Sequence, residues 1–544
     1  MSNSRGDGGG DEENKSKSDL MPDEEIEDAF AKRVKVDGEV IVLESPAAYS
    51  SRVSSKFRST SYDLVQASIV GVITGLSVAL FKLSIEAIRE FCYDQAFLSQ
   101  TRFALATIPA FGGLMVGILL LLGSFPAGLR GTVMEVDKDS VSPAKELIAQ
   151  VKGQLSFIRK SVAAVFTLGT GCSLGPEGPC VEIGMSVARS CIDLKPRIVS
   201  RRTTWNRLLL SCGAAAGVAA GFNAPIAGVF FALEIMQNAF YSVQEENRSK
   251  GLPLENGSYE AGTLLSTTAT ITPVLLASVL SALVAKVLLG NHLVLVLTEY
   301  SLKTPLVELP LYLLLGGVSG CVAFIFSRLA KLSQSFFDGK LGADGVRHAI
   351  QRVPSSFKPV IGGLACGIVG LWFPQILFFG YETLNSLLSN NSLPTSLALS
   401  LLIVKMLTTA FSAGSGLVGG TFAPSLFLGA MTGAAFHNVA CVILNIFSAY
   451  AGVTTIFDLA DVPAYAMVGA ASVLAALFRA PLTASLLLFE LTRDYDVILP
   501  LMASAGIGSV IGDMLDSKFE RVQERRRRDQ DSVSWGDLAD RGDS

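Results

Sequence analysis

The sequence predicts an all-α protein that crosses a membrane several times and is built from two related halves with broken helices. Half of the 544 residues are hydrophobic, and only 17% are charged. The mean hydropathy is +0.46. So little charge in so long and apolar a chain argues for an integral membrane protein and against a large soluble enzyme. In addition, two glycine- and proline-containing segments far apart in the sequence share one construction.

Residues 1–60 form a polar segment that we expect to be a disordered cytosolic tail. The opening is acidic and rich in Gly and Ser, without the apolar stretch of a secretory signal, and too acidic for a typical organelle transit peptide. Residues 34–43 could form a short strand or contact the membrane. Arg52, Lys56 and Arg58 precede the first apolar segment, which favours a cytosolic N-terminus.

Apolar segments between residues 61 and 516 predict the membrane helices. The first two are each about 20 residues long, which is the length needed to span a bilayer. Several later segments are too short to cross alone, as expected for half-helices whose broken ends are buried in protein. The expected helices are 64–85, 104–122, 208–220, 225–236, 264–289, 309–326, 360–373, 397–411, 424–440, 464–477, 481–491 and 497–511.

Residues 171–184 place an acid between glycines and prolines inside an apolar run, in the order Gly175-Pro176-Glu177-Gly178-Pro179. Proline suits the first turn of a helix, and glycines let the backbone approach a ligand closely. Glu177 is therefore expected at a helix N-terminus, where free N–H groups favour negative charge. A carboxylate at membrane depth is costly and indicates a function. The alternative is a surface turn whose acid merely caps the helix.

Residues 416–429 repeat this construction, and they predict an internal duplication with halves at 61–300 and 301–516. Residues 213–225 and 469–481 also align without a gap, and both continue to an acid. Paired apolar segments interrupted by Gly and Pro indicate the midplane site of a transporter. Duplicated structural helices without a site are the alternative. The aligned pairs are Pro179/Pro424, Gly171/Gly416, Gly175/Gly420, Gly184/Gly429 and Glu234/Glu490.

These motifs resemble the CLC family of chloride channels and anion/proton exchangers, from about residue 62 to 516. Residues 175–179 are similar to the family's G-(K/R)-E-G-P stretch, and residues 420–424 are similar to its G-x-F-x-P. Residues 222–228 with Glu234 resemble the helix that follows the gate. Residues 494–500 resemble the segment that carries the family's anion-coordinating tyrosine. The chain looks most like the plant and cyanobacterial side of the family, particularly a plant Golgi-type branch.

The resemblance implies a CLC-type inverted-repeat bundle that moves chloride or a related monovalent anion, as a homodimer with one pathway per subunit. Glu177 would be the gate, occupying an anion position when ionised and leaving when protonated. Backbone amides would hold the anion, because a fixed lysine could hold it too tightly for rapid passage. The Tyr495 hydroxyl would assist, its alternative role being an interfacial anchor. The expected anion-binding residues are Gly175, Gly178, Pro179, Gly420, Thr421, Phe422, Ala423 and Tyr495.

Three departures from the family pattern bear on mechanism. Exchangers of the family usually carry a proton-receiving glutamate directly after the position of Glu234, where this chain has Ile235. That favours a channel or a loosely coupled transporter over a strict exchanger, unless Glu234 or a water path substitutes. Arg130 stands where the family has an anion-selecting serine. Arg130 would either attract anions to the inner mouth or be a helix-end residue whose charged group reaches toward water. The selectivity of the protein between chloride and nitrate therefore stays open. Pro176 replaces a basic residue beside the gate, which reduces attraction at the outer mouth.

No residue pattern indicates an enzyme, a cofactor, a metal site or a nucleic-acid partner. The eight cysteines are scattered singly, and the three histidines are far apart. Cys172 and Cys180 flank Glu177, but no further ligand completes a metal set. Two alternatives of another class remain: a cation-coupled solute symporter, which would depend on sodium, and a non-conducting membrane scaffold, which anion flux would exclude.

The basic segment 517–544 is expected to be a cytosolic tail, and membrane lipid is expected as a partner of the protein as a whole. Arg521 and the run 525–528 mark the cytosolic side, and binding of anionic lipid is the alternative role. Both termini are thus expected in the cytosol of a multi-pass protein, in an endomembrane of Golgi type rather than a plastid membrane. The tail is too short for the nucleotide-sensing module of many family members, so regulation by that route should be absent.

Overall fold

The computed structural model describes residues 32–36, 39–43, 46–93, 102–126, 128–136, 143–193, 203–249, 268–290, 308–342, 344–389, 393–451 and 459–539. The chain divides into two compact units, residues 1–63 and 64–544. Apart from one pair of strands, the regular elements of the described residues are helices.

The two strands lie in the first unit, within the polar segment in which residues 34–43 were expected to form a short strand or to contact the membrane. Strand β1 (Lys32–Val36) pairs antiparallel with β2 (Glu39–Leu43), so that Val34 faces Ile41. Alternating valines in one strand and a β-branched run in the other favour this pairing. The helix α2 (Pro46–Tyr93) also begins before residue 60. The strands fall largely within residues 34–43, where a short strand was one of the two expectations, and residues 1–31 lie outside the described residues.

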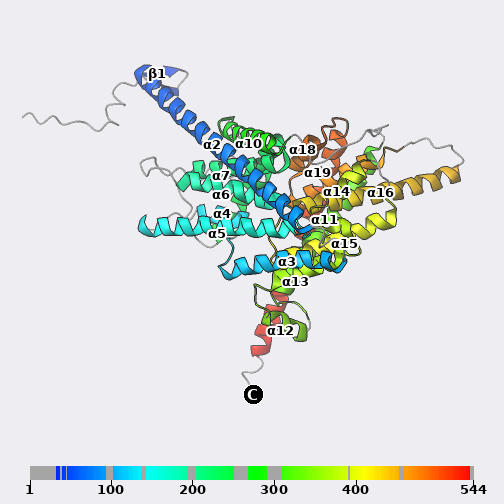
Figure 1. Ribbon diagram of the computed structural model, residues 1–544. Coiled ribbons are helices and arrows are strands. Elements are labelled where there is room, and N and C mark those ends of the chain that lie inside the picture. Colours follow the sequence, from blue (N-terminus) through cyan, green and yellow to red (C-terminus); the bar gives the residue numbers. More distant parts are fainter. Residues whose placement is uncertain are drawn as a thin grey trace, which may run out of the picture. The chain divides into compact units, whose positions relative to one another are not determined.

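The second unit is a bundle of helices that follows the predicted apolar segments closely (Figure 1). Each of the twelve expected segments overlaps a helix, and the additional helices are mostly short or polar. After α2 the elements are α3 (Arg102–Leu121), α4 (Leu129–Val136), α5 (Pro143–Gly169), α6 (Glu177–Asp193), α7 (Thr203–Phe222), α8 (Pro225–Phe231), the π-helical η1 (Ala232–Met236), α9 (Gln237–Ser249), α10 (Thr268–Leu289), α11 (Leu309–Phe337), α12 (Asp344–Arg352), α13 (Lys358–Gly370), the 3-10 turn η3 (Pro374–Ile376), α14 (Tyr381–Leu388), α15 (Thr395–Gly414), α16 (Phe422–Ala451), α17 (Val462–Phe478), α18 (Pro481–Thr492) and α19 (Ile498–Ala539).

The helices have the lengths and surfaces of a membrane protein. Among the described residues, seven helices are long and apolar enough to cross a membrane, and four apolar helices are shorter. Large apolar side chains point outward and are more than half exposed, as at Leu80, Leu83, Ile443 and Phe447. In water such a surface would be unfavourable, whereas lipid accommodates it. The protein is an all-α, multi-pass membrane protein, as the sequence predicted.

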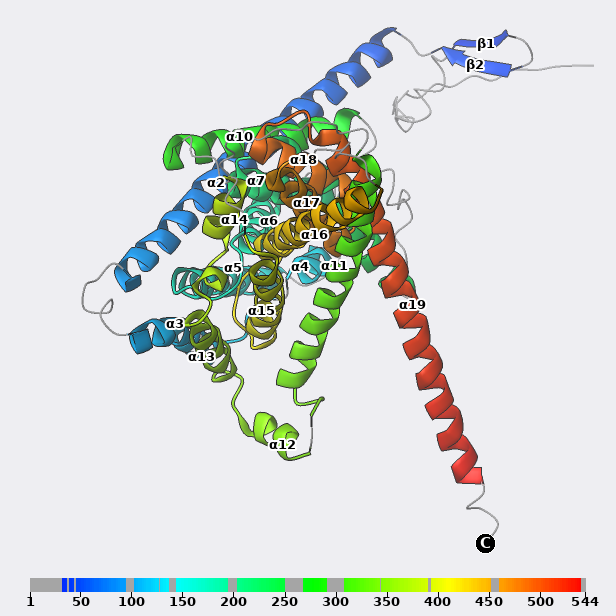
Figure 2. The same ribbon diagram turned by 90° about the vertical axis from the view of Figure 1, so that its right-hand side faces the viewer.

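Corresponding helices of the two halves pack in the same way. Helix α6 packs against α7, and α16 packs against α17 (Figure 2). A Cβ atom added at Gly184 would lie 2.0 Å from the carbonyl oxygen of Gly213, and one added at Gly429 would lie 2.3 Å from that of Gly469. Small residues allow this close approach of membrane helices. Residues that the internal alignment had paired, Gly184 with Gly429 and Gly213 with Gly469, thus make equivalent close contacts in the two halves.

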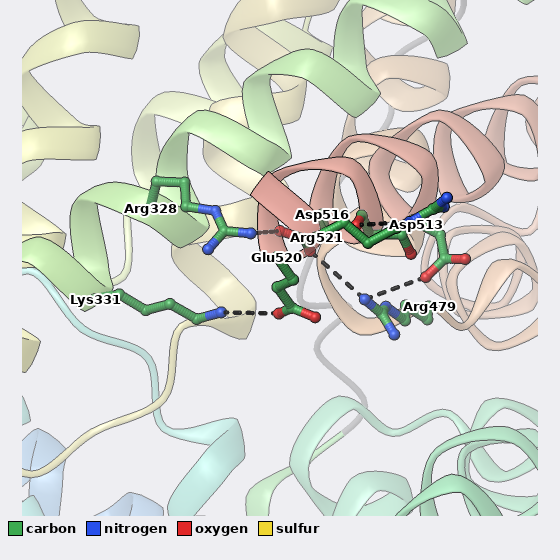
Figure 3. Close-up of polar contacts among 8 residues, drawn as sticks. Arg328, Lys331, Arg479, Asp513, Asp516, Glu520 and Arg521 are labelled. Atoms are coloured by element: carbon green, nitrogen blue, oxygen red, sulfur yellow. Dashed lines mark hydrogen bonds and ion pairs between the residues drawn. The ribbon is translucent and has the colours of Figure 1, made fainter. Parts of the chain in front are cut away.

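Helix α19 runs through the segment that we expected to be a separate tail. It packs beside α11 (Figure 2) and is joined to it by an ion pair between Arg328 and Asp516, with a nitrogen–oxygen distance of 2.7 Å. Arg479, at the C-terminal end of α17, contacts Asp513 at 3.1 Å and Asp516 at 3.7 Å (Figure 3). The ion pairs connect three helices at one place, which fixes the start of the basic segment against the bundle.

Candidate functional site

The two glycine-containing loops meet at their aligned residues. The Gly175 amide donates a hydrogen bond to the Gly420 carbonyl, and the Gly420 amide donates one to the Gly175 carbonyl, each with a nitrogen–oxygen distance of 2.7 Å. Two residues further on, α6 begins at Glu177 and α16 begins at Phe422. The N-termini of two helices therefore start from a single contact, one from each half of the chain.

Glycine is required here because the loops touch through their backbones. A Cβ atom at Gly420 would lie 2.7 Å from the amide nitrogen of Gly178. A Cβ atom at Gly175 would lie 2.3 Å from Oε2 of Glu177 and 3.2 Å from the amide nitrogen of Ala423. The absence of side chains at these two glycines lets main-chain amides of both loops come close to the Glu177 carboxylate.

Seven of the eight residues expected to bind the anion come together in these loops and first helical turns. Pro179 lies in the first turn of α6, as predicted, and Pro424 lies at the equivalent place in α16. Phe422 and Ala423 are buried. The brought-together residues are Gly175, Gly178, Pro179, Gly420, Thr421, Phe422 and Ala423. Amide groups at two helix N-termini supply partial positive charge at this place.

Glu177 is buried at this junction, with 3% of its surface exposed. The hydroxyl of Tyr381 donates a hydrogen bond to Oε1 at 2.5 Å. Oε2 is buried without a hydrogen-bond partner among the described residues, although the amides of Glu177 itself and of Ala423 face the carboxylate. The alternative of an exposed, merely capping acid does not fit this burial. The position suits a group that competes with an anion for the same amides.

A lysine approaches the acid from α2. The ammonium of Lys82 donates hydrogen bonds to the carbonyls of Ala220 and Gly221 at the end of α7, and it interacts electrostatically with Glu177 and Cys180. We missed Lys82 in the sequence, although it is the only charged residue of the apolar segment 64–85. Charged residues inside membrane segments usually mark a functional site. Lys82 brings positive charge near the acid. The loop itself does not, because Pro176 stands where the family pattern has a basic residue.

Aromatic rings surround Phe422, the residue of the second half that aligns with Glu177. Its ring centroid lies 5.2 Å from that of Phe222 and 5.0 Å from that of Phe478. These two phenylalanines are themselves aligned residues of the two halves. One face of the junction is therefore apolar, while the other carries the carboxylate and its donors.

The acid Glu490 caps a helix of the opposite half. Its carboxylate, on α18, accepts hydrogen bonds from the amides of Ile226 at 2.9 Å and Ala227 at 2.7 Å. These amides belong to the first turn of α8 and would otherwise lack partners. A carboxylate at a helix N-terminus is favoured by the helix dipole as well. The contact joins α18 firmly to α8.

Glu234 makes the equivalent contact in the reverse direction. Its carboxylate, in η1, accepts hydrogen bonds from the amides of Leu482 at 3.1 Å and Thr483 at 2.7 Å, and from the Thr483 hydroxyl at 2.7 Å. Both oxygens are thus occupied at the start of α18. This geometry gives Glu234 a structural role and does not support it as a step in a proton path, and the adjacent Ile235 packs against the core.

Replacing Glu234 by alanine should destabilise the protein by about 2 kcal/mol, since three hydrogen bonds to its carboxylate are lost, two of them from the buried Thr483. We expect a lower melting temperature in detergent, with the ratio of anions to protons moved unchanged. Glu245→Ala, at an exposed acid of α9, is the matched control. Loss of proton movement in a Glu234→Ala protein of normal stability would return Glu234 to the proton path.

One expected site residue, Tyr495, makes no described contact with the junction. Tyr495 is 74% exposed, and its ring packs on Phe489 with a centroid distance of 4.7 Å. Its described contacts do not include Glu177 or the glycine loops. The backbone is left-handed at Arg493, whose φ is +58°, and Tyr495 lines an open cavity of about 500 Å³ together with Asn223 and Pro225. Arg130 lies in α4, and its side chain is outside the described residues.

The sequence of the chain is similar to those of known proteins. A sequence family described as voltage gated chloride channel matches residues 135–513. The chain is 35% identical over 463 residues to the chloride channel protein CLC-e of Arabidopsis thaliana, covering 82% of this chain and 59% of that protein. It is 29% identical over 480 residues to the H(+)/Cl(-) exchange transporter ClcA of Salmonella arizonae, covering 86% and 89%.

A solved structure has the same fold. The crystal structure of a slow cyanobacterial Cl-/H+ antiporter superposes with a TM-score of 0.64 at 24% identity, over 86% of this chain and 99% of that one. The chain spans about three-fifths of the length of its plant relative. The matched family covers well over half of the chain, from α4 to α19. The chain therefore belongs to the voltage-gated chloride channel (CLC) family, with relatives in its plant branch.

Proposed function

We propose that this protein moves chloride or a related monovalent anion across a membrane, with Glu177 as a protonatable gate. The observation that carries the proposal is the reciprocal Gly175–Gly420 contact, from which two helix N-termini start beside a buried carboxylate. An anion that leaves water needs hydrogen-bond donors, and amide groups provide them without the tight binding of a fixed ammonium. The membrane anion pathway would pass this junction.

Competition between the anion and Glu177 gives the gate its mechanism. When ionised, the carboxylate occupies the space that faces the amides of Glu177 and Ala423, and it repels an arriving anion. When protonated, it loses its attraction to the amides and can leave them to the anion. Low pH should therefore favour passage, and a high anion concentration should favour protonation of Glu177 because the two negative charges repel each other.

Channel-like or loosely proton-coupled passage is the form that we favour. Ile235 cannot carry a proton, and the Glu234 carboxylate is occupied by donors of α18. The alternative is a strict anion/proton exchanger, and the 29% identity to a protein named as an H(+)/Cl(-) exchange transporter favours it. A water path past Ile235 would be needed in that case.

Purified protein in liposomes tests the proposal and separates its two forms. We expect chloride and nitrate flux without a requirement for sodium, and a reversal potential that follows the anion gradient. An imposed pH gradient should shift that potential little. A shift of the size set by a fixed anion-to-proton ratio would establish the exchanger, and no anion flux at all would contradict the proposal.

We propose further that the protein is a homodimer of an endomembrane, of Golgi type, with both termini in the cytosol. Support for the orientation comes from the basic residues near the C-terminal end of α19 and before the first apolar segment. Protease protection of tagged termini in sealed vesicles measures the orientation directly, and cleavage of neither terminus from the cytosolic side would contradict it.

A further inference from the structure

We infer that Tyr381 is a latch that holds Glu177 in the closed position and sets the pH at which the gate opens. This inference rests on the proposed gating role of Glu177. The Tyr381 hydroxyl donates to Oε1 of Glu177, and it is the only side-chain hydrogen-bond donor to that carboxylate among the described residues. Nothing in the sequence pattern had pointed to Tyr381.

The segment before Tyr381 is held in place by hydrogen bonds, and this fixes the position of the Tyr381 ring beside Glu177. The buried Lys405 of α15 donates hydrogen bonds to the carbonyls of Ile376 at 2.7 Å and Phe378 at 3.0 Å. The Phe378 amide donates to the Gly171 carbonyl at 3.1 Å, at the start of the loop that carries Glu177. The ammonium and this amide together tie the two loops to each other.

Glycine completes the turn into α14. Gly380 has a φ of +87°, and a Cβ atom there would lie 2.6 Å from the ring of Phe427. The backbone therefore packs on α16 directly before Tyr381. Groups that are locked by packing and hydrogen bonds keep their geometry most precisely. The tyrosine hydroxyl is a fixed donor, and the glutamate side chain is the partner that can move.

The groups that face Glu177 determine whether loss of the Tyr381 hydrogen bond raises or lowers the pH at which the gate opens. They are Tyr381 from α14, Lys82 from α2 and Cys180 from its own helix α6. Lys82 is engaged with carbonyls of α7, which leaves the tyrosine as the hydrogen-bonding side chain. A hydroxyl binds an ionised carboxylate about twice as strongly as a neutral acid. The bond therefore favours the ionised, closed gate, and its loss should let protons open the gate at higher pH.

Tyr381→Phe in the full-length protein tests the latch, because it removes only the hydroxyl oxygen. In liposomes, the midpoint of chloride flux against pH should move up by about one pH unit, with the maximal flux at low pH unchanged. Tyr312→Phe is the matched control. Its hydroxyl donates to another buried carboxylate, that of Glu308, at 3.2 Å, and its loss should leave the midpoint where it is.

A second substitution covers the case in which Tyr381→Phe fails to fold. Replacing Tyr381 with 3-fluorotyrosine keeps the ring and makes the hydroxyl a stronger donor, so the midpoint should move to lower pH. An unchanged midpoint in either folded protein, or a shift in the same direction in the Tyr312 control, would overturn the latch. Glu177→Gln is measured in parallel: a normal pH profile there would contradict the gate itself, whereas a flat one leaves the Tyr381 result as a test of the latch alone.

Discussion

Glu177→Gln is expected to make anion flux nearly independent of pH, while flux through the unchanged protein rises as the pH falls. Glutamine has the shape of the protonated acid and cannot ionise, so it cannot compete with an anion through charge. For a gate controlled by one proton, the open fraction above the midpoint falls about tenfold for each pH unit. Over two such units the unchanged protein should lose about a hundredfold in flux, against less than about twofold for the variant.

Chloride efflux from liposomes, recorded from about pH 4.5 to pH 7.5, measures this difference. Glu86→Gln is a suitable control, because Glu86 is an acid on the exposed side of α2 with 57% of its side chain accessible. Its pH profile should match that of the unchanged protein. A Glu177→Gln profile that also matches would remove Glu177 from the gating role, whatever its burial.

Gly420→Ala is expected to abolish most of the flux and to lower stability. Its Cβ would lie 2.7 Å from the amide nitrogen and 3.2 Å from the Cα of Gly178. Backbone atoms cannot turn aside as the end of a side chain can, so the loops must separate and the two Gly175–Gly420 hydrogen bonds must lengthen. Overpacking of this kind costs about 1–3 kcal/mol, and we expect flux to fall by at least about tenfold as the helix starts move apart.

The melting temperature and the flux are measured together for this substitution. Gly153→Ala in α5 provides the control, because a Cβ atom there meets nothing within 4 Å. It should keep full flux and normal stability. Full flux in a stable Gly420→Ala protein would show that close contact between the loops is not needed for anion passage. It would contradict the proposal that the anion pathway depends on the Gly175–Gly420 junction.

Much of the junction was visible in the sequence because it depends on local rules. Proline in a first turn and glycine at a close contact are demanded by the backbone itself, so residues 175–179 and 420–424 could be identified by pattern. The alignment of the two halves then paired Gly175 with Gly420, and the structure joins these two residues. The twelve apolar segments likewise overlap helices, since an apolar segment in lipid satisfies its backbone groups by forming a helix.

The partners of Glu177 could not be predicted in this way. Tyr381 is 204 positions away from Glu177 in the sequence. It lies in a short helix that none of the predicted apolar segments included. Lys82 gave a signal, as a lone charge in a membrane segment, but its partner could not be read from its position. The surroundings of Tyr495 could not be predicted either, because a motif fixes the residue type and not the left-handed backbone turn at Arg493 just before it.

The crossed contacts of Glu234 and Glu490 have a mechanical consequence. Each carboxylate braces the other helix, so changing the angle between α8 and α18 would break five hydrogen bonds at once. Many carriers expose a binding site alternately to each side of the membrane by rocking one half of the protein against the other. The hydrogen bonds of Glu234 and Glu490 resist such a motion. In such a frame, swinging a single side chain is the least costly motion, and turnover should be limited by that swing rather than by a rearrangement of domains.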